Sequence, residues 1–155
     1  MKLNERSGFT FVELMTVIAI VAIVAIVGGP NFMKWKDAAK LRSAINTLRG
    51  DLQMAKSLAI KQNVIVRVQF SSSGYTIATA SGAVLKTRQM PAGVVIDLME
   101  TTLLDNDGDG SPDTSFNGRG IPLPGIAGDL GKVVVDGPSG SKTISINTVG
   151  RIQLT

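Results

Sequence analysis

The stretch GFTFVEL (residues 8–14) opens a long apolar segment and decides how the chain folds. A short polar leader ends at Gly8, and no charged residue occurs in residues 14–33. That is about 20 residues, and at about 1.5 Å rise per residue such a helix spans roughly 30 Å, the thickness of a bilayer's hydrocarbon core. One carboxylate, Glu13, stands at the head of this segment. Because a charge in a membrane helix is costly, Glu13 is a candidate functional residue.

The apolar segment continues into a helix of a different kind. Gly28-Gly29-Pro30 predicts a kink or a locally melted turn, because proline removes a backbone donor and glycine weakens helix propensity. Apolar residues then recur at three- and four-residue spacing between Ala38 and Ala59. This spacing predicts an amphipathic helix over residues 34–63 whose apolar stripe covers the face of a sheet.

From residue 64 the hydrophobic period changes to two, which is typical of half-buried strands. Glycine, proline and serine clusters mark the turns between the runs. The sequence thus predicts strands at residues 64–70, 75–79, 83–89, 94–99, 132–136, 143–147 and 151–154. One long helix followed by antiparallel strands is an α+β fold.

Composition excludes several classes of function. The 155 residues contain no Cys and no His, so a disulfide framework, a lipoprotein anchor, the usual catalytic triads and the common zinc sites are all missing. We therefore predict that the chain is not an enzyme. The net charge of +4 is unevenly spread, with most charges basic in residues 34–61 and all charges acidic in residues 97–113. Such asymmetry fits either contacts between subunits or a solvated helix beside an acidic loop.

The N-terminal pattern closely resembles that of type IV pilins and type II secretion pseudopilins. In that superfamily a basic leader ends at a glycine, an aromatic residue follows, and a glutamate lies four residues further on; Gly8, Phe9 and Glu13 fill these places. The resemblance implies that a prepilin peptidase cleaves after Gly8 and that Phe9 becomes N-methylated. Phe11 departs slightly, since leucine is commoner there. A plain signal anchor or a secretory signal peptide fits less well, because neither accounts for both the glycine and Glu13.

Cleavage after Gly8 would give the mature chain a new charge. Phe9 would carry a free α-amine, positive near neutral pH. This amine could pair with Glu13 of another subunit, which offsets the desolvation of each charge and sets the axial register. Some pseudopilins at the extreme tip lack the glutamate, so the resemblance implies that this chain lies below another subunit.

A second segment, FNGRGIPL (residues 116–123), precedes a closing hairpin around residues 144–152. This arrangement resembles the C-terminal domain of the GspH/FimT group of minor pseudopilins and pilins, in which Phe116 and Gly118 would lie at a strand and a turn. Gly150-Arg151 would start the last strand. Ordinary β-hairpin chemistry explains part of the pattern.

These patterns together predict four regions: a leader at residues 1–8, a transmembrane and assembly helix at 9–33, an amphipathic helix at 34–63 and a periplasmic β domain at 64–155. We predict a minor pseudopilin of a type II secretion system, held in the inner membrane and assembled into a periplasmic filament. Its implied partners are other pilin or pseudopilin subunits, the prepilin peptidase and the inner-membrane assembly platform. The alternative is a minor type IV pilin for pilus assembly or DNA uptake.

Two further binding hypotheses rest on shorter motifs. Some FimT-like pilins linked to DNA uptake carry a Gly-Arg-x-Arg tail, but here Gln153 replaces the second arginine, so nucleic-acid binding is disfavoured. DNDGDGSPD (residues 105–113) matches the first half of an EF-hand-type loop, and Asp105, Asp107, Asp109 and Asp113 could hold calcium. Phe116 stands where a bidentate glutamate would complete that loop, and an acidic solvated turn is the alternative. The sequence predicts no other cofactor.

Overall fold

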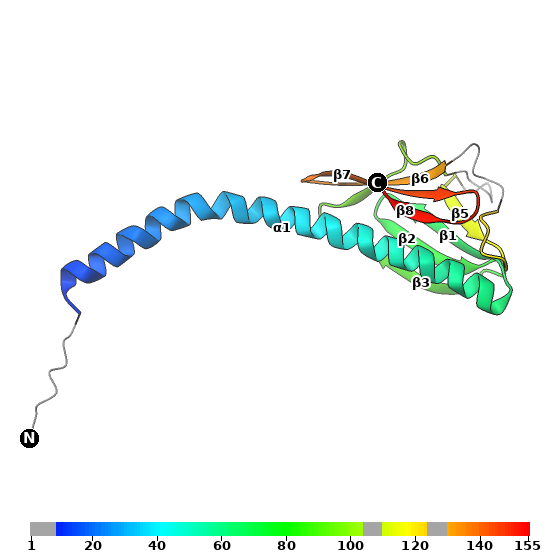
Figure 1. Cartoon of the computed structure of the whole chain (residues 1–155), viewed down its shortest axis with the longest axis horizontal. Helices are drawn as coiled ribbons and strands as arrows, with labels where there is room; N and C mark the ends of the chain where they lie inside the picture. The colour runs from blue at the N-terminus through cyan, green and yellow to red at the C-terminus, as the bar shows by residue number, and fades with distance from the viewer. Residues whose placement is uncertain (1–8, 104–109, 124–129) are drawn as a thin grey trace, which may run out of the picture. The chain divides into compact units, whose positions relative to one another are not determined.

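The computed structural model describes residues 9–103, 110–123 and 130–155, except for the side chains of residues 27–30 and 130. The chain divides into two compact units, Met1–Lys36 and Asp37–Thr155. One helix, α1 (Phe11–Gln62), starts in the first unit and ends in the second. Figure 1 gives the order of the elements that follow it.

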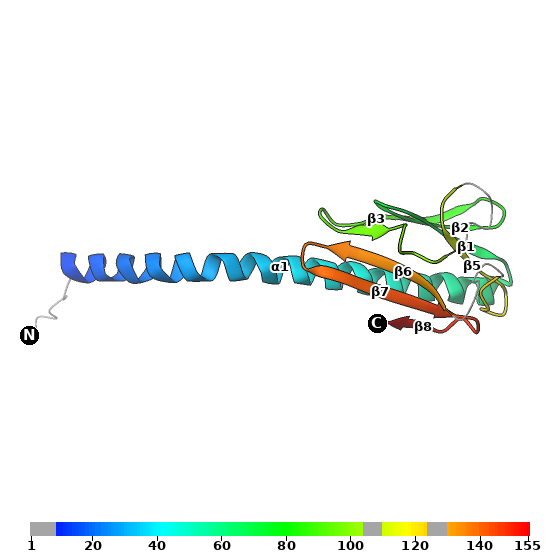
Figure 2. The ribbon, with the colours of Figure 1, turned by 90° about the horizontal axis from the view of Figure 1, so that it is seen from above.

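Within the described residues, eight strands follow α1 and form two four-stranded antiparallel sheets. The first sheet has the order β3-β2-β1-β5 and the second has the order β4-β6-β7-β8. Figure 2 separates β1, β2 and β3 in green from β6, β7 and β8 in orange and red. The strands are β1 (Val66–Ser71), β2 (Gly74–Thr79), β3 (Val84–Gln89), β4 (Val95–Asp97), β5 (Asp113–Phe116), β6 (Leu130–Gly137), β7 (Gly140–Asn147) and β8 (Ile152–Leu154).

The ends of α1 are fixed by local chemistry. At the start, the Thr10 hydroxyl oxygen accepts a hydrogen bond from the backbone N–H of Glu13 at 3.2 Å, which is an N-cap. At the other end, Asn63 adopts φ 51° and the Val64 N–H donates to the Ala59 carbonyl at 3.2 Å. That bond and the left-handed residue are those of a Schellman motif, which stops the helix where the sequence predicts it.

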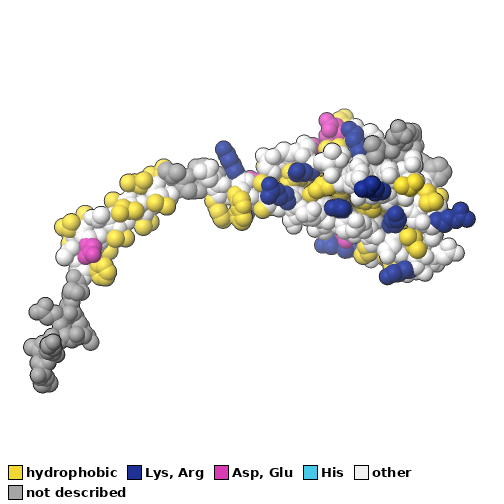
Figure 3. All heavy atoms as spheres, in the orientation of Figure 1, with side chains coloured by type: hydrophobic (Ala, Val, Ile, Leu, Met, Phe, Trp, Pro, Cys, Tyr) yellow, Lys and Arg dark blue, Asp and Glu magenta, His cyan; other side chains and the backbone are white. Residues whose placement is uncertain are grey.

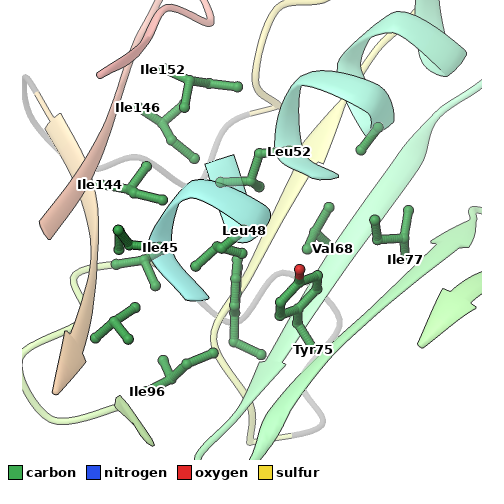
Figure 4. Packing of buried hydrophobic residues seen from close by; sticks show 14 of the residues in the cluster. Ile45, Leu48, Leu52, Val68, Tyr75, Ile77, Ile96, Ile144, Ile146 and Ile152 are labelled. Atoms are coloured by element: carbon green, nitrogen blue, oxygen red, sulfur yellow. The ribbon is translucent and has the colours of Figure 1, made fainter. Parts of the chain in front are cut away.

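The core of the second unit lies between α1 and the inner faces of both sheets. The stripe predicted from helical spacing is fully buried at Leu48, Leu52, Ala55 and Ala59, each 0% exposed. In Figure 4, Ile45, Leu48 and Leu52 of the helix lie between Val68, Tyr75 and Ile77 of the first sheet and Ile144, Ile146 and Ile152 of the second. A single helix therefore holds two sheets together through one apolar core.

The strand predictions agree with the structure in place and order, with one omission. Strand β5 was not predicted, because its sequence, DTSF, is polar and follows the acidic loop. All four of its residues are nevertheless buried, and β5 pairs with β1 in the register Val66↔Phe116 to Gln69↔Asp113. Strand β4 is also shorter than the predicted 94–99, because Asp97 starts a turn there by accepting hydrogen bonds from the N–H groups of Met99 and Glu100.

The backbone is helical through Gly28-Gly29-Pro30, and the predicted kink there stays a prediction. By length and composition, no single helix in the described part of the chain could cross a membrane. The pieces Phe11–Ile26 and Asn31–Gln62 meet that requirement when taken together.

Candidate functional site

The N-terminal turn of α1 presents the residues that the sequence predicts to direct assembly. Phe9 is 86% exposed and Glu13 is exposed in the first helical turn. Thr10, which lies between Phe9 and Glu13, caps the helix. Its hydroxyl oxygen accepts a hydrogen bond from the Glu13 N–H, and its carbonyl accepts one from the Leu14 N–H, both at 3.2 Å. A carboxylate in the first turn also interacts favourably with the helix dipole, by about 0.3–1 kcal/mol in an exposed position. Gly8 lies outside the described residues.

Behind this turn, large hydrophobic side chains are exposed on every side of the helix. Figure 3 shows them gathered over the first part of α1, next to an acidic side chain. Such residues are exposed in α1 from Phe11 to Ile26, and again at Phe32, Met33 and Trp35. A helix that is apolar all round is buried either in a membrane or against other chains. This surface therefore requires a lipid or protein environment.

The structure describes only the last part of the candidate calcium loop, residues 110–113. Asp105, Asp107 and Asp109 lie outside the described residues. The structure places Asp113 in β5 with its side chain 0% exposed, and its carboxylate lies 3.8 Å from Nε of Arg67 on β1. No group of three or more acidic side chains that could hold a metal ion occurs within residues 9–103, 110–123 and 130–155. Calcium binding by the whole loop stays a prediction.

A buried polar cluster joins α1 to the first sheet. Asp51, 7% exposed, accepts hydrogen bonds from the Tyr75 hydroxyl at 2.7 Å and from Lys86 Nζ at 2.6 Å. Arg88 Nε donates to the same carboxylate at 3.4 Å. Tyr75 and Arg88 are opposite one another across β2 and β3, and Lys86 and Arg88 lie on the same face of β3 at a period of two. Three side chains from β2 and β3 thus satisfy the one buried charge on α1.

The ionisation of this cluster follows from its contacts. Burial by itself would raise the pKa of Asp51, but the hydrogen bonds from Lys86 and Tyr75 and the charges of Lys86 and Arg88 outweigh it. The pKa of Asp51 is therefore lowered from 3.8. Burial, together with the hydrogen bond to Asp51 and its negative charge, raises the pKa of Tyr75 well above 10.0. The cluster holds a carboxylate and a neutral phenol over the whole range around neutral pH.

Replacing Asp51 with asparagine should lower the free energy of unfolding by about 2 kcal/mol at neutral pH, because charge-assisted hydrogen bonds to a buried group are lost. A group whose pKa is lowered by folding stabilises the protein above its unfolded pKa, here 3.8, and ceases to do so as the pH falls through the folded value. The difference between wild type and Asp51→Asn should thus shrink in acid below 3.8. Urea titrations of the full chain in detergent, followed by circular dichroism at several pH values, measure it.

Asp37→Asn is the matched control on the same helix. Asp37 pairs with Lys40 at 3.6 Å, but both side chains are about one-third exposed, at 32% and 36%. An exposed pair of this kind contributes about 0.5 kcal/mol or less. Equal effects of Asp37→Asn and Asp51→Asn would contradict the assigned role of the buried cluster.

A second cluster joins the end of α1 to the glycine-rich segments near the C-terminus. Lys56 Nζ donates to the Gly150 carbonyl at 2.8 Å. A side chain at Gly120 would press on Lys56 and Ile60, and one at Gly118 would collide with Asn63. The segment FNGRGIPL and the turn before β8 are therefore glycine-rich because backbone packs against the helix end there. Phe116 ends β5 and Gly118 lies in a turn, as the resemblance implies, but the last strand starts at Ile152, directly after Gly150-Arg151 and not at these residues.

Comparison with protein families matches both parts of the chain. The model described as "Type II transport protein GspH" matches residues 44–150, which is more than half of the chain. The model described as "Prokaryotic N-terminal methylation motif" matches residues 3–28. The second match covers residues 3–8 of the leader together with Phe9 and Glu13, and the first covers both clusters described above.

Individual relatives agree with these matches. The competence protein ComGD of Bacillus subtilis (strain 168) is 26% identical over 136 residues, covering 88% of this chain and 84% of ComGD. The crystal structure of the type IV minor pilin FimU from Pseudomonas aeruginosa (strain PAO1) is similar with a TM-score of 0.58 at 22% identity, covering 78% of this chain and 92% of FimU. The minor pseudopilin EpsH from the type 2 secretion system of Vibrio cholerae has a TM-score of 0.57 at 12% identity, covering 75% and 96%.

At such identities the two structures establish the shared fold, a long helix followed by antiparallel sheets. The family is established by the model that spans the helix core and the β domain. This chain belongs to the GspH family and is a minor pilin or pseudopilin of a type IV pilus-related system, a structural filament subunit that assembles with other pilin subunits and is not an enzyme.

Proposed function

We propose that the chain is a minor pseudopilin of a type II secretion system. The match of residues 44–150 to the type II transport family carries this proposal. Before assembly the apolar part of α1 spans the inner membrane, and the β domain lies in the periplasm. The filament to which the subunit is added then works in protein secretion.

Processing supplies the charge on which assembly depends. A prepilin peptidase removes residues 1–8, cutting after Gly8, and Phe9 becomes the N-methylated first residue. Its amine then lies just before the Thr10 cap, at the start of the helix whose first turn holds Glu13. In the filament, the amine of one subunit pairs with the Glu13 carboxylate of another while the assembly platform adds subunits from the membrane. Each buried charge is compensated by the other, so the pairing also fixes the axial position of each subunit.

A minor pilin of a competence or pilus system is the second candidate. The 26% identity to a competence protein over 136 residues favours it specifically. Both candidates share the processing motif, the helix and the β domain, so they differ in the system served and not in the chemistry of assembly.

Deletion of the gene in its host separates the two candidates. We expect secreted proteins to accumulate inside the cell while surface pili and transformation by added DNA stay normal. Complementation with the wild-type chain, but not with a chain in which Gly8 is replaced to block cleavage, should restore secretion. Normal secretion with loss of pili or of transformation would overturn the secretion proposal in favour of the second candidate.

A further inference from the structure

Two exposed aromatic side chains lie at the end of the uncharged segment. Phe32 and Trp35 are 62% and 66% exposed, and their ring centroids lie 6.0 Å apart. They are three residues apart, so they share one face of α1. Trp35 is the single tryptophan of the chain. An exposed tryptophan stacked near a phenylalanine on a lone helix is not explained by packing within either unit.

Two lysines flank Trp35. Lys34 and Lys36 are both exposed, and they are the first charged residues after Glu13. Tryptophan, with its amphipathic ring, is enriched where a membrane helix leaves the hydrocarbon, at the level of the lipid headgroups. Lysine side chains near helix ends extend their ammonium groups towards the headgroups, and anionic headgroups attract them. The pair and its lysines therefore carry both chemical features of a membrane-interface anchor.

The distance to Glu13 agrees with this assignment. From Glu13 to Trp35 the helix advances by about 22 residues, and at about 1.5 Å each this is roughly 33 Å. The hydrocarbon core of a bilayer is about 30 Å thick. When Trp35 lies at one headgroup layer, Glu13 consequently lies at the opposite one, where a carboxylate keeps its water.

We propose that Phe32, Trp35, Lys34 and Lys36 form an interfacial anchor that binds the headgroup layer of an anionic phospholipid bilayer and fixes the depth of α1 before assembly. The inference rests on the proposed membrane-inserted state of the subunit. By holding the far end of the helix, the anchor keeps Glu13 at the other surface. There the carboxylate is charged and reachable by the amine of another subunit. The anchor thus prepares the subunit for assembly and takes no part in the pairing itself.

The tryptophan fluorescence of the protein reports on Trp35 alone, because the chain has a single tryptophan. The full chain is inserted into vesicles of phosphatidylcholine and phosphatidylglycerol, with a fraction of the lipid brominated either near the glycerol or near the chain ends. We expect the shallow bromines to quench Trp35 more than the deep ones by about twofold or more, since the ring lies at headgroup level. Equal quenching, or stronger quenching by the deep bromines, would overturn the anchor.

A shifted probe provides the matched control. In the double variant Phe32→Trp/Trp35→Phe the indole moves one turn, about 4.5 Å, towards the middle of the bilayer while the aromatic pair is kept. Quenching should shift towards the deep bromines. Identical depth profiles for both proteins would contradict a fixed helix depth.

Two further results distinguish failure of the anchor alone from failure of the membrane-inserted state. Emission that resists both lipid quenchers in a chain that alkaline carbonate cannot extract would mean that protein, such as a second copy of the chain, covers the aromatic pair. This result would overturn the anchor and leave the proposed function standing. A chain that carbonate extracts from the vesicles would overturn the membrane-inserted state and the anchor together.

Discussion

Glu13→Ala is expected to leave the chain stably inserted in the membrane and to remove it almost completely from the filament. An amine buried in the filament without its carboxylate would cost about 3–5 kcal/mol. This corresponds to roughly two to four orders of magnitude in the incorporation equilibrium. Insertion should persist, because replacing a charged residue by alanine makes the segment more apolar. The measurement is the amount of the variant in sheared filaments relative to the amount in isolated membranes.

Thr16→Ala is the control for this experiment. Thr16 lies one turn further along the same helix, and its hydroxyl donates only to the Val12 carbonyl of its own helix, at 2.8 Å. Its loss should leave filament incorporation close to wild type. Incorporation of Glu13→Ala at the wild-type level would contradict pairing between Glu13 and the amine of Phe9.

Gly150→Ala is expected to cause a large loss of stability in the β domain. Gly150 has φ +76°, and an added Cβ would collide with the Gly120 carbonyl oxygen while lying 3.1 Å from Lys56 Nζ. Strain at a left-handed position and overpacking against backbone each cost about 1–3 kcal/mol, so we expect a loss of roughly 3–4 kcal/mol. Urea unfolding of the full chain in detergent, followed by circular dichroism, measures the loss.

Gly82→Ala isolates the conformational part of this effect. Gly82 has a similar φ of +88°, but no atom lies within 4 Å of the position that a Cβ would take. We expect it to cost only about 1–2 kcal/mol, the penalty of the left-handed conformation alone. If the two substitutions destabilised the protein equally, close packing of the β7–β8 turn against the Gly120 carbonyl would not be what requires glycine at residue 150.

The elements governed by regular spacing could be predicted from sequence. The apolar stripe of α1 recurs every three or four residues, and Leu48, Leu52 and Ala55 are buried as that spacing requires. The alternation in residues 64–70 likewise predicts β1, whose burial alternates between buried and half-buried side chains from Val66 to Phe70. These patterns are local, because each side chain's environment is set by the periodicity of its own element.

Strand β5 and the Asp51 cluster depend on contacts between distant segments, and periodicity does not reveal such contacts. Asp113 belongs to a segment, residues 105–113, whose composition is that of a metal-binding turn. It is nevertheless buried in strand β5, because β1 pairs with this strand. Asp51 appears in the sequence as one of two acids among basic residues in residues 34–61. A signal was present, since Asp51 lies three residues after Leu48 and therefore at the edge of the buried stripe. Its partners on β2 and β3 are recognisable only once the sheet is placed against the helix.

We propose that the mature chain is a filament subunit whose first residue is Phe9. Mass spectrometry of the N-terminal peptide from sheared, purified filaments tests this proposal. We expect a peptide that begins at Phe9 and carries one N-methyl group. Filament-associated protein that still begins at Met1, or protein found in membranes and never in filaments, would contradict it.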